Sequence, residues 1–299
     1  MHLSAFESLS NTIGHKMSYK ITIIPKTISK GHKMQHIKDL LHSCSHLLIT
    51  AGAGMSADSG LPTYRDKEGF WRQYPALKEL NIDFEEIATP STFLFNPSLA
   101  WAFYAHRYNL YANATPHQGY SLLLEFAKGK KSFFVLTSNV DSHFLKAGFP
   151  SQNLYECHGN IEFLQCRCTH ELWRLKGEIK MNGFKVVELP KCPFCGSVAR
   201  PNILMFNDWD FNDEREYTQA ERFHSWKKAL NQDELLLILE FGAGLAIPTI
   251  RNMGEKLASS HPNAKLIRIN PQDAQIPKNL GYSLHMGALE GIKSLLDHP

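Results

Sequence analysis

Four of the six cysteines stand in two close pairs, and thiolates at this spacing can bind a metal ion. Cys166 and Cys168 form a C-x-C pair, and Cys192 and Cys195 form a C-x-x-C pair within the segment C-P-F-C-G. Four thiolates suit one structural zinc ion, which would stabilise a small insertion with little core of its own. Two alternatives remain, that His170 replaces Cys168 as a ligand or that the site has decayed.

A Gly-Ala-Gly turn at residues 52–54 follows an apolar run at 46–51. Gly52, Gly54 and Ala57 fit the pattern G-x-G-x-x-G/A, in which glycines let the backbone approach a phosphate. A helix that starts within 55–59 would direct its free N–H groups at that phosphate. The same pattern also occurs in ordinary turns, so these residues alone leave both interpretations open.

Asn139 and Asp141 follow a second apolar run, 132–137, at the end of a strand where open α/β sheets bind ligands. Their side chains offer a donor and an acceptor, which suits a carboxamide, although both residue types also end strands in simple turns. His158 precedes Gly159, and an imidazole with an ordinary pKa of about 6.5 can accept a hydroxyl proton near neutral pH. A packed or solvated histidine is the alternative.

These motifs, in this order, resemble those of the sirtuins, which are NAD-consuming protein lysine deacylases. Residues 52–65 resemble the opening signature of that family, and residues 137–141 resemble its Thr-Gln-Asn-hydrophobic-Asp segment. His158-Gly159 resembles the catalytic His-Gly, and residues 192–195 resemble half of the family's zinc site. The matches together span about residues 46–290.

The resemblance implies NAD as a co-substrate, one structural zinc ion, and acylated lysine side chains of proteins as the second substrate. His158 becomes the general base, with Asn139 and Asp141 beside the nicotinamide. The expected products are lysine, nicotinamide and O-acyl-ADP-ribose. Further contacts to NAD are implied for Gly52, Ala53, Gly54, Ser56, Ala57, Pro62, Thr63, Tyr64, Arg65, Trp71, Ser138, Gly242, Ala243, Gly244, Asn270 and Ala288.

Several positions depart from the sirtuin pattern. Ser138 stands where the family has glutamine, His143-Phe144 replaces Leu-His, and the turn at 242–244 lacks the two hydroxyls of Gly-Thr-Ser. Asn207-Asp208 replaces Gly-Glu beside the expected peptide groove. These changes keep two other functions open: an NAD glycohydrolase or ADP-ribosyltransferase, and a non-catalytic NAD or ADP-ribose sensor. His158 argues against the sensor, because binding alone needs no base.

Tyr104 and Arg107 lie three residues apart within a helix predicted at 99–111, so they share one face. A phenol beside a guanidinium is a good receptor for a carboxylate. The Tyr-x-x-Arg pair, together with Thr63, resembles the sirtuins that remove succinyl and malonyl groups. In the alternative interpretation Tyr104 packs among aromatic neighbours and Arg107 points to water.

The elements that must position these residues alternate between strands and helices, which predicts a doubly wound parallel sheet of the Rossmann-like α/β class. We expect strands at 46–51, 132–137, 154–156, 234–241, 264–269 and 282–285. We expect helices at 34–44, 99–111, 118–128, 213–230, 249–258 and 288–296, and a connector at 90–96. The core would comprise 34–65, 131–159 and 203–299, interrupted by a helical insertion at 66–130 and a zinc-binding insertion at 160–202.

Composition limits the remaining classes. Hydrophobic residues make up 43 per cent of the 299 residues, and no apolar run is long enough to cross a membrane. The net charge of +3, without a basic stripe, argues against a zinc ribbon that binds nucleic acid. Paired cysteines indicate metal ligation in a reducing compartment, so we expect a cytoplasmic protein. Residues 1–33 are expected to be a flexible extension, with a targeting segment as the alternative.

Overall fold

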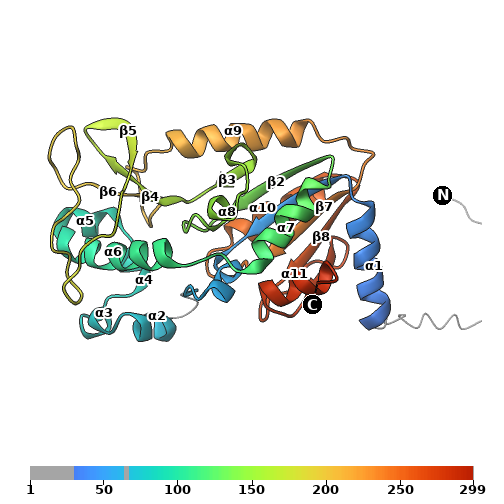
Figure 1. The fold of residues 1–299 in the computed structure, drawn as a ribbon, viewed down its shortest axis with the longest axis horizontal. Helices are drawn as coiled ribbons and strands as arrows, with labels where there is room; N and C mark the ends of the chain where they lie inside the picture. The colour runs from blue at the N-terminus through green and yellow to red at the C-terminus, as the bar shows by residue number, and fades with distance from the viewer. Residues whose placement is uncertain (1–29, 64–66, 299) are drawn as a thin grey trace, which may run out of the picture.

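The computed structural model describes residues 30–63 and 67–298, which form a large and a small lobe (Figure 1). The large lobe contains a six-stranded sheet of order β3-β2-β1-β7-β8-β9 in which all pairs are parallel. The doubly wound Rossmann-like sheet and all six of its expected strands are therefore confirmed. Their bounds are β1 His46–Ala51, β2 Ser132–Thr137, β3 Leu154–Glu156, β7 Leu236–Phe241, β8 Ala264–Ile269 and β9 Gly281–Leu284.

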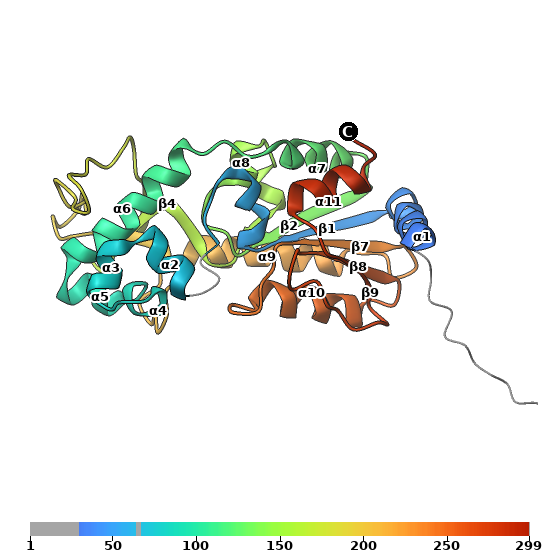
Figure 2. The same cartoon turned by 90° about the horizontal axis from the view of Figure 1, so that it is seen from below.

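Helices cover both faces of this sheet, as Figure 2 shows from below. One face packs against α1 (Lys30–Ser43), α7 (Gln118–Lys128) and α11 (Ala288–Leu295). The other packs against α9 (Glu214–Lys228) and α10 (Thr249–Ser260). Successive side chains of β1 point to opposite faces, so Leu47 and Ile49 join the first core and Leu48 joins the second. A strand buried on both faces is a continuous run of apolar residues in the sequence, so it can be predicted from the sequence.

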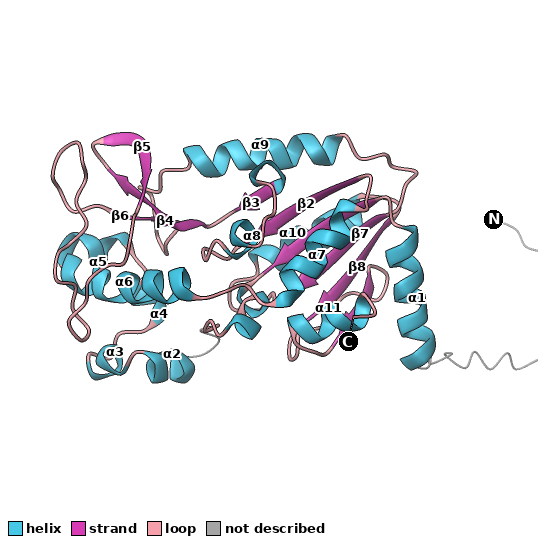
Figure 3. Ribbon diagram, viewed as in Figure 1, coloured by secondary structure: helices cyan, strands magenta, loops and turns pink. Residues whose placement is uncertain are grey.

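The small lobe combines helices with a three-stranded antiparallel sheet, seen beside the parallel strands in Figure 3. Its core is rich in aromatic side chains, including Phe70, Trp101 and Phe103. The helices are α2 Lys67–Gln73, α3 Pro75–Glu79, α4 Phe84–Ile87, α5 Pro90–Phe95 and α6 Pro97–Asn113. The strands are β4 Gly159–Cys166, β5 Thr169–Arg174 and β6 Arg200–Ile203, in the order β5-β4-β6.

Three local expectations differ from the structure. The expected helix within 55–59 is instead two 3-10 turns, η1 (Ala53–Met55) and η2 (Ala57–Ser59), because Gly60 adopts a left-handed conformation that ends the second turn. The expected connector at 90–96 is helix α5, whose first turn is capped by the Thr89 side chain with Pro90 at the first helical position. Helix α1 begins at Lys30, within the expected extension.

Connectivity fixes where a ligand can bind. The chain passes outward from β1 through β2 to β3 and later returns to the other side of β1 with β7. Ligands of open α/β sheets bind at the carboxyl ends of the strands where the order reverses, which here are β1 and β7. Across residues 30–63 and 67–298, no helix combines the length and apolar character that a bilayer span requires. The remaining short elements are α8 (His143–Lys146) and η3 (Ser151–Asn153).

Candidate active site

A cavity of about 770 Å³ lies at the carboxyl ends of β1, β2 and β7, with walls from both lobes. The structure brings most of the predicted site residues together around this central cavity. Those that line it are Gly52, Ala53, Gly54, Ser56, Pro62, Thr63, Tyr104, Arg107, Ser138, Asn139, Asp141, His158, Gly242, Ala243 and Gly244. Tyr64 and Arg65, which were also predicted to contact NAD, lie outside the described residues.

The two glycine turns of the cavity floor pack directly against each other. Gly52 N–H donates to Phe241 O (2.9 Å) and Gly54 N–H donates to Gly242 O (3.0 Å). A Cβ on Gly54 would come within 2.6 Å of Gly242 Cα, and Gly242 has a positive φ of 60°. Contact between the two turns therefore requires glycine at these positions, whatever ligand binds above them.

Asn139 and Asp141 converge on Ser56, which is 2 per cent exposed. Ser56 Oγ donates to Asp141 Oδ2 (2.5 Å), and Asn139 Nδ2 donates both to Gly52 O (3.0 Å) and to Ser56 Oγ (3.2 Å). The other carboxylate oxygen, Asp141 Oδ1, accepts from His143 N–H (2.9 Å). An amide and a carboxylate are thus held in fixed directions beside the glycine turn, where they can bind a polar group such as a carboxamide.

His158 occupies the crossing between the lobes, in the turn from β3 to β4. Gly159 has a φ of +80°, and a Cβ there would lie 2.2 Å from Asn202 O, so only glycine fits after the histidine. His158 is half-buried, and burial lowers the pKa of its imidazole. The ring is therefore neutral at pH 7 and can accept a proton.

Asn160, which no sequence motif pointed to, joins the His158 turn to the Asp141 loop. Its amide is fully buried, donates to Ser142 Oγ (2.8 Å) and Glu156 Oε1 (2.6 Å), and accepts from Glu162 N–H (2.9 Å). Ser142 directly follows Asp141 and holds a left-handed φ of 62°, which is costly for a non-glycine residue. The hydrogen bonds between Asn160 and Ser142 hold Ser142 in this conformation.

The small lobe contributes a cation to the cavity wall. Arg107 is 8 per cent exposed and donates from Nε (3.1 Å) and Nη2 (3.0 Å) to the hydroxyl oxygen of Tyr111. Its guanidinium lies between 5.3 and 5.9 Å from the ring centres of Phe84, Phe103, Tyr104 and Tyr111. Burial raises the pKa of Tyr104 to about 12, so this phenol remains a hydrogen-bond donor. The alternative interpretation is right that Tyr104 packs among aromatic neighbours, with ring centres 5.4 Å from Phe93 and 5.0 Å from Phe103, and wrong that Arg107 points to water.

The far end of the cavity is shaped by two residues that do not line it. Asn270 is 1 per cent exposed and donates to Ala243 O (3.1 Å), so it supports the turn at 242–244 from behind. Arg251 was not predicted; it donates to Ala243 O (3.1 Å), Asp273 O (2.6 Å) and Gln275 O (3.0 Å). Together they tie the glycine turn after β7 to the loop after β8.

Three predicted contact residues lie away from the central cavity. Ala57 is exposed on the second 3-10 turn. Trp71 donates from its indole to Ile82 O (2.8 Å) and packs against the small-lobe core. Ala288 starts α11 and is buried in the core between the sheet and that helix. Trp71 and Ala288 therefore pack in the two cores and Ala57 faces solvent, so the structure brings none of the three to the cavity.

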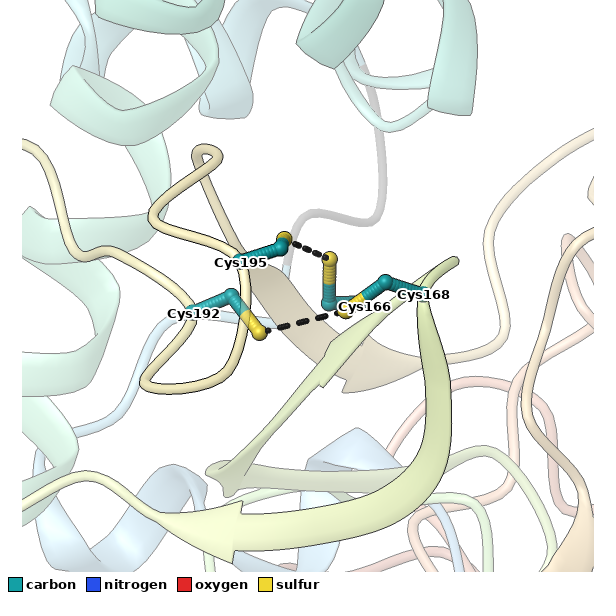
Figure 4. Close-up of side chains that lie close together, drawn as sticks. All are labelled: Cys166, Cys168, Cys192 and Cys195. Carbon is teal, nitrogen blue, oxygen red and sulfur yellow. Dashed lines mark hydrogen bonds between the residues drawn. The ribbon is translucent and has the colours of Figure 1, made fainter.

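The four paired cysteines meet at one point of the small lobe (Figure 4). All four Sγ atoms lie within 4.8 Å of one another, with Cys166 3.7 Å from Cys195 and Cys168 3.5 Å from Cys192. Sulfurs at the corners of a tetrahedron around zinc, each about 2.3 Å from the metal, are about 3.8 Å apart. The cluster therefore fits one structural zinc ion, and the one-residue spacing of the first pair does not prevent it.

Local structure around the second cysteine pair supports metal binding. Gly196 has a left-handed φ of 72°, and its N–H donates to Cys192 O (2.9 Å), which closes the knuckle turn. Hydrogen bonds from the side chain and backbone of Ser197 lower the pKa of the Cys195 thiol to about 6. His170, the alternative ligand, is exposed and outside the cluster. Of the two candidates, Cys168 completes the set.

Comparison with known proteins gives a family match and close relatives. Residues 52–239 match the model of the Sir2 family. An NAD-dependent protein deacylase of Pyrococcus furiosus is 37% identical over 193 residues, covering 64% of this chain and 72% of the relative. An NAD-dependent protein deacylase of Aquifex aeolicus is 28% identical over 257 residues, covering 85% of this chain and 95% of the relative.

A solved structure shares the architecture as well. A Sir2 homologue in complex with NAD superimposes with a TM-score of 0.65 at 25% identity, covering 88% of this chain and 92% of that one. The common part therefore includes both lobes and the crossing between them that carries His158.

Proposed function

The chain belongs to the Sir2 family, and from this membership we infer that it is an NAD-dependent protein lysine deacylase. The observation that carries the inference is the meeting of three features around one cavity: paired glycine turns, the Ser56–Asn139–Asp141 cluster, and a neutral His158. A protein that only stored or sensed NAD would need the first two but not the base.

We propose that the glycine turns at 52–54 and 242–244 receive the pyrophosphate side of NAD, and that Asn139 and Asp141 hold the nicotinamide carboxamide. A carboxamide has one donor group and one acceptor, which an aspartate and an asparagine complement. Backbone N–H groups at such turns favour anions.

When bound, NAD would supply a ribose carbon whose bond to nicotinamide breaks as the acyl-lysine oxygen attacks it, so that nicotinamide leaves. In our proposal His158 takes a proton from a ribose hydroxyl, which then captures the acyl carbon, and the bond from that carbon to the lysine nitrogen breaks to release lysine. Burial suits this role because a lowered pKa keeps the ring unprotonated at neutral pH. Asn160 and Gly159 hold the backbone turn that carries His158 at the junction of the two lobes.

The test is the dependence of nicotinamide release on an acylated peptide. Incubation of the protein with NAD and acyl-peptide should release nicotinamide and O-acyl-ADP-ribose in equal amounts, measured by mass spectrometry. Without peptide, release should be small. If nicotinamide is released at the same rate without peptide, the activity is NAD hydrolysis, the function that Ser138 in place of glutamine keeps open.

We further propose that the acyl group carries a carboxylate, as succinyl and malonyl groups do. Arg107 and Tyr104 line the same cavity as His158, and Tyr111 orients the guanidinium through two hydrogen bonds. A cation surrounded by aromatic rings is poorly hydrated, so an anionic acyl group gains more there than at the surface. An acetyl group has no charge to place beside it.

A further inference from the structure

The hydroxyl of Ser56 is the meeting point of three side chains of the candidate active site. Ser56 Oγ lies 2.5 Å from Asp141 Oδ2, 3.2 Å from Asn139 Nδ2 and 2.9 Å from the hydroxyl of Tyr120. Tyr120 comes from α7, 64 residues away in sequence, and is fully buried. It does not line the central cavity, so it touches the cluster only from behind.

The direction of each hydrogen bond follows from counting hydrogens. A serine hydroxyl has one hydrogen and can accept two, while a carboxylate only accepts. The Ser56 hydrogen therefore goes to Asp141. The Asn139 amide nitrogen must face Ser56, because it also donates to Gly52 O (3.0 Å). One acceptor position remains on Ser56, so Tyr120 must be the donor.

The Tyr120 ring is held firmly enough to fix that donor. Its ring meets His143 edge-on at 5.6 Å and Phe144 edge-on at 5.0 Å, and both belong to α8, directly after the Asp141 loop. His117 packs on it at 4.8 Å. Burial, with the nearby Asp141 carboxylate, keeps the pKa of Tyr120 well above its ordinary value, so the phenol stays a donor.

We propose that Tyr120 is a positioning residue of the nicotinamide end of the site. By filling the last acceptor position of Ser56, it turns the serine hydrogen toward Asp141 and fixes the directions of the Asp141 carboxylate and the Asn139 amide. The proposal rests on the proposed function, because it takes NAD as the ligand that these two groups bind.

The experiment compares Tyr120→Phe, Ser56→Ala and the double variant by calorimetric titration of the full chain with NAD, without acyl-peptide. Tyr120→Phe should weaken NAD binding by about 2- to 12-fold, the range of one neutral hydrogen bond. Ser56→Ala should weaken it at least as much. Because Tyr120 acts through Ser56, adding Tyr120→Phe to Ser56→Ala should cause no further loss.

Tyr155→Phe is the matched control. Tyr155 is also buried, and its hydroxyl bonds Glu216 on the other side of the sheet. Removing that hydroxyl should leave NAD affinity unchanged. The melting temperature of each variant, measured without ligand, shows whether the substitution lowers its stability. If Ser56→Ala does not fold, the difference between Tyr120→Phe and Tyr155→Phe decides the question.

Two results would overturn the assignment. One is a Tyr120→Phe protein that binds NAD as tightly as the wild type. The other is an equal loss on the wild-type and Ser56→Ala backgrounds, which would mean that Tyr120 acts through the fold and not through Ser56. If the wild-type protein itself binds no NAD, the proposed function fails and this assignment fails with it. If the wild-type protein binds NAD but Tyr120→Phe does not weaken the binding, only this assignment fails.

Discussion

The large lobe is held together by parallel strand pairing, whereas the small lobe depends on aromatic rings and four thiols. Strand β1 pairs with β2 and with β7 along its whole length, and its neighbours on both faces are mainly aliphatic. In the small lobe, β4 shifts register against both β5 and β6. Shorter, irregular strands contribute less to stability, and a zinc ion bound by the cysteine cluster would supply the further stabilisation that the small lobe needs.

The same difference divides the central cavity. On the large-lobe side, Ser56, Asn139 and Asp141 are bonded to one another and to the backbone, so their directions are fixed. On the small-lobe side, Arg107 and Tyr104 lie among aromatic rings. This difference agrees with our proposal that the large lobe carries the chemistry common to the family and that the small lobe reads the acyl group.

Removing zinc should have the largest effect, and it should unfold part of the small lobe while the large lobe stays folded. Chelation, or Cys192→Ser, should unfold residues 160–202, because binding of structural zinc is coupled to folding and contributes about 10–16 kcal/mol in zinc-finger peptides. The parallel sheet should remain folded. Hydrogen exchange, read separately for β4–β6 and for β1 and β7, measures the effect. Cys44→Ser, the same change in the large lobe, is the control, and a stable protein that contains no zinc would contradict the prediction.

Changing the base tests whether chemistry and binding separate as proposed. His158→Ala should lower kcat for deacylation by about 10²- to 10⁴-fold, the usual contribution of a general base. NAD binding should persist, since the glycine turns and the Ser56 cluster remain. The exposed His170 offers a control, because His170→Ala should alter neither the rate nor the zinc content. An unchanged rate in His158→Ala would remove this residue from its role.

Selectivity should depend on the small lobe alone. A charge-assisted contact of about 1.5–3 kcal/mol at Arg107 should favour succinyl- over acetyl-lysine by roughly 10- to 150-fold. Arg107→Met keeps the apolar stem and loses the charge, so it should erase the preference and spare deacetylation. The measurement is kcat/KM for matched acetyl, malonyl and succinyl peptides, with Arg72→Met, at an exposed position of the same lobe, as control. Equal losses on all three would assign Arg107 to the fold.

Sequence patterns predicted the two regions unequally for a physical reason. Strands buried on both faces, such as β1 and β8, appear as apolar runs. The apolar run of β2 likewise locates the strand end after which Asn139 and Asp141 reach the cavity. Small-lobe contacts join residues far apart in the chain, as when the Trp101 indole donates to Ala199 O, and no local pattern reports them.

The same rule covers the residues that were not predicted and the predicted residues that lie away from the cavity. Tyr120 and Asn160 have ordinary roles as helix and strand residues, and only the fold brings them to the site. Conversely, Trp71 and Ala288 match family positions in sequence, yet their side chains pack in the cores. A motif therefore predicts which segment reaches the cavity more reliably than which side chain enters it.

The smallest expected effect concerns the ring of His143, which lies in the large lobe but outside the hydrogen-bond network around Ser56. Its ring is fully buried, and neither Nδ1 nor Nε2 has a hydrogen-bond partner among residues 30–63 and 67–298. Such a group costs about 1–3 kcal/mol. His143→Leu, which restores an apolar residue where the sirtuin pattern has leucine, should therefore stabilise the protein by about 1 kcal/mol at pH 7.5.

This gain should grow in acid. Burial lowers the pKa of His143 in the folded state, an effect opposed by Asp141 and reinforced by Lys146 and His117. Below the unfolded value of about 6.5 the unfolded chain binds the proton more readily, so wild-type stability falls as pH falls, by up to about 1.4 kcal/mol per pH unit. His143→Leu removes this loss. Urea unfolding at pH 7.5 and 5.5 measures it, with the exposed His224→Leu as control. If His143→Leu were less stable at both pH values, the His143 ring would have a hydrogen-bond partner such as water and would belong to the large-lobe network.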